Sequence, residues 1–294
     1  MILFKRVGES FRHIEDREWV LLFLETLGVL VGILLAFALQ EWAQQRAEAA
    51  KQHELLERLF EESEATVSVL RADREDMNKI VNREISFATL LVHRNICPPR
   101  PMWDAVDTMP MYPPIVVPST VYQEVMGSGG LANIPDHRVR QSVSYFRAQF
   151  DWIQAQNTNF RGSRILPVPP QDPRVTLDFD QSTDEPEVSR YDSAPLCADH
   201  SFRNVIADEV RNHMAVVNLR RQLAEGAIEM CATIGASLNH ECNPLFGGPL
   251  MGADKKVAVE AVRKMKAPRV LNRSPRSPSP SASPSARGAE KGHD

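Results

Sequence analysis

The chain has 294 residues and a formal net charge of −4 at pH 7, and 43% of its residues are hydrophobic. That hydrophobic share excludes a wholly disordered chain and is enough for the core of one folded domain of ordinary size. The charge is unevenly placed, because residues 254–294 hold ten Lys/Arg against four Asp/Glu. The overall balance is not that of a nucleic-acid-binding protein, so we expect no nucleic-acid partner.

Residues 19–42 form an apolar stretch of the length that a membrane requires. Its central twenty residues contain only two polar side chains, Glu25 and Thr26, and Trp19 and Trp42 stand at its ends. A helix of about twenty residues is roughly 30 Å long, which matches the hydrocarbon core of a bilayer. Tryptophan is enriched at both membrane interfaces. We therefore predict a single transmembrane helix over 19–42, surrounded by lipid.

Small residues recur on one face of this predicted helix. Gly28 and Gly32 form a GxxxG motif, Ala36 continues it by one turn, and Glu25 falls on roughly the same face. Small residues let two helix backbones approach closely in lipid, so we expect this face to pack against a second copy or another membrane protein. The alternative is a chance motif, with Glu25 hydrated near the interface. A proton-relay role for Glu25 is not favoured, because one span supplies no pathway.

The distribution of basic residues predicts the orientation of the span. Residues 1–18 contain four Lys/Arg and the twenty residues after the span contain three. Because cytoplasmic flanks carry the excess of Lys and Arg, this favours a short cytoplasmic lead and a periplasmic bulk, anchored in the bacterial inner membrane. The lead is either an amphipathic segment on the membrane surface or an unstructured stub. A cleaved signal peptide is the alternative, but the apolar run exceeds the usual length of about 7–15 residues and carries a glutamate.

Residues 43–93 predict one long helix, because they contain neither proline nor glycine and are rich in strong helix formers. A heptad pattern places eleven mostly apolar residues on one seam. These are Leu56, Phe60, Ser63, Val67, Leu70, Arg74, Met77, Val81, Glu84, Ala88 and Leu91. The seam fits a coiled coil or packing against helices of the same domain, and Arg74 and Glu84 weaken the coiled coil. The charged residues from Glu61 to Asp76 are expected to face solvent.

The stretch 118–157 predicts two further helices. Ser119 is a candidate cap for a short helix that ends at the glycine-rich turn 127–130, and Asp136 is a candidate cap for a second helix. Apolar residues recur at helical spacing in the second helix: Val139, Val143, Phe146, Phe150 and Ile153. The turn does not read as a phosphate-binding loop, because no strand precedes it and no Lys-Ser/Thr follows it.

Two short motifs lie in these regions. The first consists of Gly32, Ile33, Leu35, Ala38, Leu39 and Trp42. The second consists of Tyr122, Val125, Ser128, Gly129, Leu131 and Ile134. With the long helix between them, over roughly residues 15–240, they resemble an uncharacterised bacterial family of single-span envelope proteins, the domain of unknown function 6090. The chain departs from the family by valine at 125, where leucine is usual, and by Gly130, where the family varies. The resemblance implies a topology and no activity.

Two proline-rich segments, 97–118 and 162–200, are expected to be loops. In the first, the side chains expected to lie against the domain are Trp103, Met109, Met111 and Tyr112. In the second, Val175, Leu177 and Phe179 alternate with polar residues, which suits one short strand or an arm along the helices. The acidic residues that follow lack the spacing of a calcium loop and are expected to be solvated.

A last long helix is predicted from Ser201 to about Leu238, with Asp199 or Ser201 as its cap. Its apolar face contains His213, which we expect to be a core histidine with its hydrogen bonds satisfied. Beyond Pro249 the composition predicts a basic, Pro/Ser-rich disordered tail, with at most one or two amphipathic turns over 254–266. Such a tail either contacts anionic lipid or other polyanions or has no partner.

The four cysteines are Cys97, Cys197, Cys231 and Cys242. In an oxidising compartment they allow two disulfides in three pairings, and one bond is expected to join a proline-rich loop to a nearby helix. A zinc site that adds His200 and His240 is the alternative. The spacings match no strong template, and Cys197 and Cys231 stand tens of ångströms apart along one helix. We expect neither a metal nor another cofactor.

The predicted fold is therefore all-α, with four parts: a lead over 1–18, a transmembrane helix over 19–42, an elongated exported helical domain over 43–248 and a disordered tail over 249–294. No catalytic motif is present, which argues against an enzyme without excluding a hydrolase with an unfamiliar site. We expect a structural or protein-interaction role in the envelope. The alternative is a periplasmic sensor that binds a ligand between the helices of 43–93 and 201–238 and acts through a membrane partner.

Overall fold

The computed structural model describes residues 16–127, 129–179 and 187–267. The chain is mostly helical, with 76% helix and 3% strand, so the predicted helical class is confirmed and a small sheet is the departure from an all-α fold. Most of the lead 1–18, Ser128 and the tail beyond 267 lie outside the described residues.

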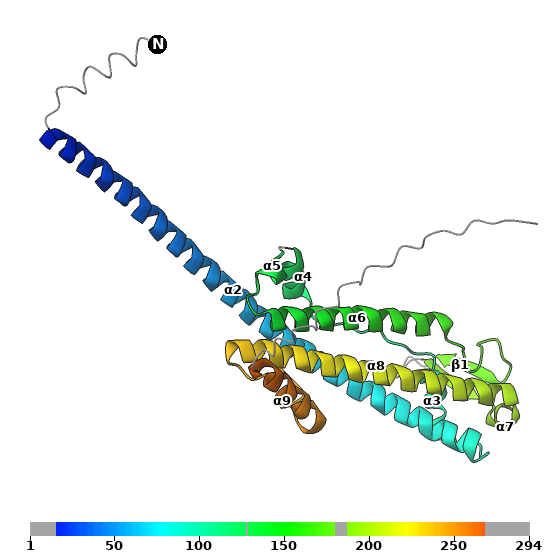
Figure 1. The fold of residues 1–294 in the computed structure, drawn as a ribbon. Helices are drawn as coiled ribbons and strands as arrows, with labels where there is room; N and C mark the ends of the chain where they lie inside the picture. The colour runs from blue at the N-terminus through cyan, green and yellow to red at the C-terminus, as the bar shows by residue number, and fades with distance from the viewer. Residues whose placement is uncertain (1–15, 128, 180–186, 268–294) are drawn as a thin grey trace, which may run out of the picture.

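The first element is α2, Asp16–Ala88, a helix of 73 residues that continues as a π-helical turn over Thr89–His93. It is unbroken past the apolar stretch because no proline or glycine interrupts it. It ends before Asn95, whose φ of 52° is incompatible with a right-handed helix. Figure 1 shows that the first half of α2 projects from the molecule, whereas its second half lies within a helical bundle.

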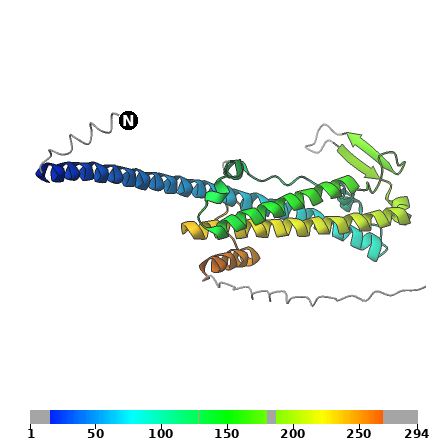
Figure 2. The same ribbon diagram turned by 45° about the horizontal axis from the view of Figure 1, so that its top comes forward.

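The bundle is built from long helices joined by shorter elements. In chain order, the elements after α2 and its π-helical turn are η3 Arg100–Met102, α3 Asp104–Thr108, α4 Thr120–Gly127, α5 Gly130–Asn133, α6 His137–Ser163, β1 Val175–Phe179, β2 Glu187–Tyr191, α7 Ser193–Ala198, α8 His200–Leu238 and α9 Gly252–Lys266. In Figure 2, α6 and α8 run beside the second half of α2, and α9 lies along α8.

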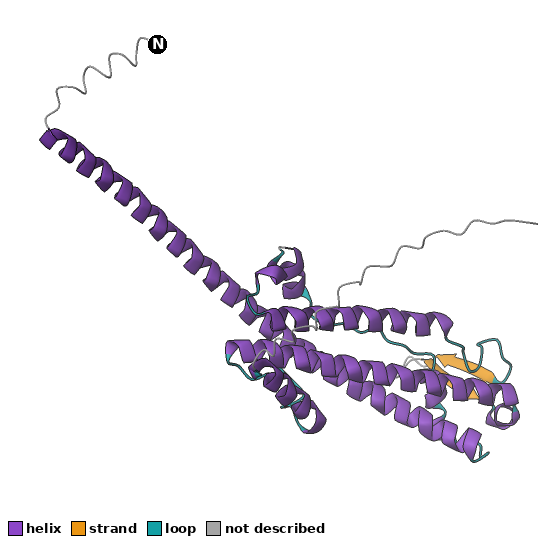
Figure 3. Cartoon of the chain, in the orientation of Figure 1, coloured by secondary structure: helices purple, strands orange, loops and turns teal. Residues whose placement is uncertain are grey.

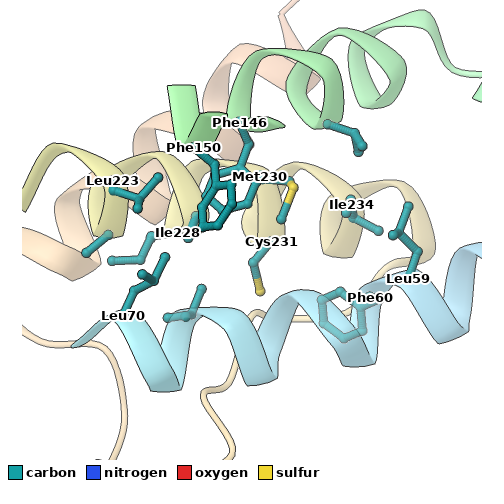
Figure 4. Close-up of a cluster of buried hydrophobic side chains, with 14 of the residues drawn as sticks. Leu59, Phe60, Leu70, Phe146, Phe150, Leu223, Ile228, Met230, Cys231 and Ile234 are labelled. Atoms are coloured by element: carbon teal, nitrogen blue, oxygen red, sulfur yellow. The ribbon is translucent and has the colours of Figure 1, made fainter. Parts of the chain in front are cut away.

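Helix α8 runs antiparallel to α2. Just after its C-terminal end, His240 stacks on Phe60 of α2, and near its N-terminal end Arg203 donates a hydrogen bond to Asn95. All eleven residues of the predicted heptad seam are buried or half-buried. Their partners belong to the same chain: α6 and α8 in the main core, which Figure 4 shows around Phe60 and Leu70, and α3 and α8 in the second core cluster near Leu91. Packing within one domain, rather than a coiled coil between chains, therefore explains the seam.

The predicted caps are correct for two helices and wrong for a third. Asp136 accepts a hydrogen bond from the backbone of Arg138 at the start of α6, and Asp199 accepts two at the start of α8. At the start of α4, the carboxylate of Glu62 accepts from the backbone N–H groups of two residues, at 2.7 and 3.0 Å. Ser119 was the predicted cap, but a side chain from α2 has taken that role.

The charged residues of α2 do not form the solvated face that their sequence suggests. Asp254 at the start of α9 is 8% exposed and receives a bidentate hydrogen bond from Arg74, at 3.0 and 2.8 Å. Asp73 of α2 pairs with Arg220 of α8, and Glu64 accepts from the backbone of Asn243. Glu61, Glu75 and Asp76 are exposed, so only part of this run meets water. The rest joins α2 to later parts of the chain.

The sheet is a two-stranded antiparallel hairpin, β1 with β2, in which Val175 pairs with Tyr191. Only the first strand was predicted, and the second was missed because Glu187–Tyr191 shows a weak apolar alternation. Figure 3 places the hairpin at the end of the bundle away from the projecting part of α2. Nearby, the buried Trp103 stacks on Phe202. Met111, expected to be buried in the same region, is 54% exposed.

Helix α9 corrects the predicted disordered tail, which was placed from Pro249 onward. Its apolar face consists of Val257, Ala258, Ala261 and Met265, and these side chains pack against the main core on α8. The tertiary contact stabilises a 15-residue segment whose basic composition alone predicts little helix.

Two disulfides clamp opposite ends of the bundle. Cys97 is bonded to Cys197 across a sequence separation of 100, and Cys231 to Cys242 across 11. The first joins the two proline-rich segments, and the second ties the end of α8 to the loop before α9. All four sulfurs are therefore engaged in disulfides, which leaves none for the alternative zinc site.

Candidate functional site

The apolar stretch of α2 has no packing partner among the residues that the structure describes. From Phe23 to Lys51 every residue is exposed, and the apolar window within this helix has 0% of its residues buried. Among the described residues, α2 is the one helix long and apolar enough to cross a membrane. Exposed apolar surface of this extent is costly in water, so this segment requires another environment.

The predicted helix-packing face is open along its whole length. A Cβ atom added at Gly28 or at Gly32 would meet nothing within 4 Å, so neither glycine is needed for packing inside the chain. Glu25 and Ala36 are also exposed. The structure brings these four residues onto one face of α2 and places no other part of the described chain against it.

Small residues continue this face beyond the predicted span. At about 100° per residue, Ala43, Ala47 and Ala50 lie within roughly 100° of Gly28 around the helix axis. All three are exposed. We call Gly28, Gly32, Ala36, Ala43, Ala47 and Ala50 the small-residue row. Its second half was not predicted, because Ala43, Ala47 and Ala50 lie among polar residues beyond the apolar stretch, where alanine is also an ordinary helix former.

Residues 43–54 form an exposed stalk between the apolar stretch and the bundle. Side-chain hydrogen bonds one turn apart, Gln45 to Glu41 and Gln44 to Glu48, line its surface. The first buried side chain of the bundle is Leu59. The stalk therefore separates the bundle from the apolar stretch by about 20 Å of solvated helix.

The second family motif is part of the bundle's packing. Tyr122 lies under the guanidinium of Arg147, 5.2 Å from its ring centre, and Ile134 is buried beside the main core. Gly129 has φ of +67°, the left-handed conformation that glycine adopts without strain. Leu131 is half-buried against the same core, while Ser128 lies outside the described residues. These contacts fold α4 and α5 onto α2 and form no chemical site.

A buried polar cluster crosses the bundle beneath the first proline-rich segment. Glu84 of α2 and His213 of α8 are both 0% exposed, and Nδ1 of His213 lies 2.8 Å from Oε2 of Glu84. The other carboxylate oxygen of Glu84 accepts from the hydroxyl of Thr108 at 2.9 Å. Within the described part of the chain Nε2 of His213 has no hydrogen-bond partner, so the expected satisfied core histidine is only half satisfied there.

Glu209, one helical turn before His213, belongs to the same cluster. It is 1% exposed and accepts hydrogen bonds from the hydroxyl of Tyr112 at 2.8 Å and from the backbone of Ile165 at 3.0 Å. Burial, together with the hydrogen bond to Glu209, raises the pKa of the Tyr112 phenol far above its ordinary value. The cluster thus joins α2, α8 and both proline-rich segments, and we assign it a structural role.

The ligand pocket expected between α2 and α8 is replaced by core. Phe60, Val67 and Leu70 of α2 belong to one buried cluster with Leu223, Ile228 and Ile234 of α8. Two hollows lie on other sides of α8. One, of about 400 Å³, is bounded by α6 and α9, and another, of about 550 Å³, lies between the end of α8 and α9. Across the described ranges, no three metal-binding side chains gather in one place.

Comparison with protein-family models, with curated proteins and with solved structures finds no match for this chain. The structure therefore defines the protein by its architecture, a disulfide-clamped helical bundle carried on a long apolar helix.

Proposed function

We propose that this chain is a membrane-anchored envelope protein with a structural or protein-interaction role. Residues 19–42 span the bacterial inner membrane, the N-terminus lies in the cytoplasm and the bundle lies in the periplasm. The observation that carries the proposal is α2 itself, whose apolar part is wholly exposed and whose other half forms the core of the bundle. The two disulfides support an oxidising compartment.

The anchor and the bundle are one continuous helix, which suits a rigid presentation of the bundle. No glycine or proline lies between Ala43 and His93, so α2 has no built-in hinge there. The bundle is therefore held at a fixed distance from the bilayer. That arrangement favours a scaffold over a sensor, because the faces of α2 and α8 that meet are packed together in one hydrophobic core.

Anchoring is tested by placing charge in the span. Leu30→Arg combined with Leu34→Arg adds about 2.5–3.5 kcal/mol per arginine to the cost of insertion, so we expect the chain to be released from membranes by carbonate washing. The measurement is the share of the full chain that remains in the membrane pellet. Leu30→Ile with Leu34→Ile is the matched control and should stay in the pellet. Full retention of the arginine variant would contradict a spanning helix.

Self-association is tested on the small-residue row. Gly28→Leu with Gly32→Leu removes the close backbone approach, so we expect at least about a fivefold weaker dimer, as membrane helix contacts are worth roughly 1–2 kcal/mol. The measurement is energy transfer between labelled copies in neutral vesicles. Leu30→Ile with Leu34→Ile changes the opposite face and should leave the transfer unchanged. Equal transfer in both variants would show that the row is not an interface.

A further inference from the structure

The hollow of about 550 Å³ between α8 and α9 is an open groove with an apolar floor. Ala232 and Ala236 form one wall on α8, and Val259 and Val262 form the other on α9. Just beyond the end of α8 the lining contains Cys242, the disulfide partner of Cys231, and the polar residues Asn239, His240, Glu241 and Asn243. Val259 is 59% exposed although it lies among these apolar side chains. We call this the α8–α9 groove.

Two lysines bracket the groove along α9. Lys255 and Lys266 both line it, and both are exposed. They are eleven positions apart, which is about 16 Å or three turns of helix. Within the described parts of the chain neither ammonium group is in an ion pair, whereas the neighbouring Arg263 and Lys264 are paired with glutamates. Unpaired cations thus stand at both ends of the α9 wall, and one carboxylate, that of Glu241, lies in the lining near the end of α8.

The placement of charge selects the kind of occupant. A lipid or fatty acid has a single anionic end, which would pair with one lysine and leave the other without an ionic partner. A helix of three turns with a small apolar face and a carboxylate at each end satisfies both lysines and the floor together. The alanines of the α8 wall permit close approach of such a helix, since their side chains are small.

The groove also lies where a membrane-associated partner can reach it. It is lined by His240, which stacks on Phe60 of α2 at a ring distance of 5.6 Å. Phe60 follows Trp42 by eighteen positions, or about 27 Å of helix. Figure 1 shows α9 at the end of the bundle nearer the projecting part of α2.

We propose that the α8–α9 groove is a docking site for an amphipathic helix of an envelope partner, with two carboxylates about three turns apart on its docking face. The location of that partner beside the membrane rests on the proposed function. The groove and its lysines do not, because they belong to the bundle.

The test uses the full chain in phosphatidylcholine nanodiscs, with its disulfides intact and empty nanodiscs as the blank. The probe is a fluorescent, end-capped 17-residue helical peptide with an alanine/leucine face and glutamates at positions i and i+11. We expect saturable binding by fluorescence anisotropy at low salt. Lys255→Glu with Lys266→Glu should weaken it at least about tenfold, because two ion pairs are lost and two like-charge contacts replace them.

Three controls make the result specific. Lys256→Glu with Arg263→Glu changes the net charge equally, but neither residue lines the groove, so binding should fall less than threefold. A peptide with lysines in place of its glutamates should bind the Lys255→Glu, Lys266→Glu variant and not the parent chain. Val259→Ser, at an exposed position, should weaken binding severalfold without unfolding the bundle.

Any of three results overturns the proposal. The first is no binding of the glutamate peptide, and the second is an equal loss of peptide affinity in the two charge variants. The third is displacement of the labelled peptide by dodecanoate at a lower concentration than the unlabelled peptide requires. The last result would identify the groove as an amphiphile site. Release of the arginine span variant from membranes is an independent measurement, so failure of the docking proposal and failure of the anchoring proposal are distinguishable.

Discussion

Replacement of His213 by alanine is expected to lower the free energy of unfolding of the bundle by about 3–5 kcal/mol. Glu84, its partner at 2.8 Å, is 0% exposed and would be left buried with Thr108 as its remaining hydrogen-bond donor. Removing one member of a buried polar pair leaves the other without its hydrogen bond, which costs far more than the intact pair contributes. Urea unfolding of the full chain in detergent, followed by near-UV circular dichroism, measures the change.

A double variant separates the pair from the space it occupies. Glu84→Met with His213→Leu replaces both groups by apolar side chains of similar size, and we expect most of the stability to return. The recovery will be incomplete, because the hydroxyl of Thr108 loses one of its two acceptors and keeps the backbone oxygen of Ala105 at 3.0 Å. If His213→Ala costs less than about 1 kcal/mol, the contact between Glu84 and His213 does not stabilise the bundle.

Removal of the disulfide between Cys97 and Cys197 is expected to lower the free energy of unfolding of the bundle by about 4–5 kcal/mol. The bond spans a sequence separation of 100, so its loss frees a long loop in the unfolded chain. It also holds both proline-rich segments at the end of the bundle away from the apolar stretch. Cys97→Ala with Cys197→Ala, measured by the same unfolding assay in the absence of reductant, tests this value.

The second disulfide provides the comparison. Cys231 and Cys242 are 11 residues apart, for which the same chain-entropy relation gives about 3 kcal/mol. The variant lacking the long-range bond should therefore unfold at a lower urea concentration than the variant lacking the short-range bond. The reverse order would show that local packing around Cys231, rather than loop length, determines the stabilisation.

Periodic apolar residues made much of the helical framework predictable. The run without glycine or proline gave α2, and Asp136 and Asp199 marked the starts of α6 and α8. The inward face of α8 does not follow hydropathy alone: Met214 is 47% exposed, whereas Glu209 and Arg220 are each 1% exposed. Polar residues in a core carry no hydropathy signal, because their burial depends on partners elsewhere in the chain.

Contacts between segments that are far apart in the sequence could not be predicted either, because no local pattern signals them. Glu62 caps α4 from a distance of about sixty residues, and Asp254 binds Arg74 from the far end of the chain. The α8–α9 groove forms because α9 folds back onto α8. The basic composition of residues 254–266 does not predict that contact. The predictable features are patterns that repeat along one helix. The features that were not predicted depend on tertiary contacts between two distant segments.

Cysteine labelling in spheroplasts distinguishes a bundle on the periplasmic side of the membrane from one in the cytoplasm. A membrane-impermeant maleimide is applied with and without an impermeant reductant, before and after permeabilisation. All four cysteines are in disulfides, so we predict labelling of unpermeabilised spheroplasts only after reduction. Labelling that needs permeabilisation but no reductant would place free thiols in the cytoplasm and contradict the account.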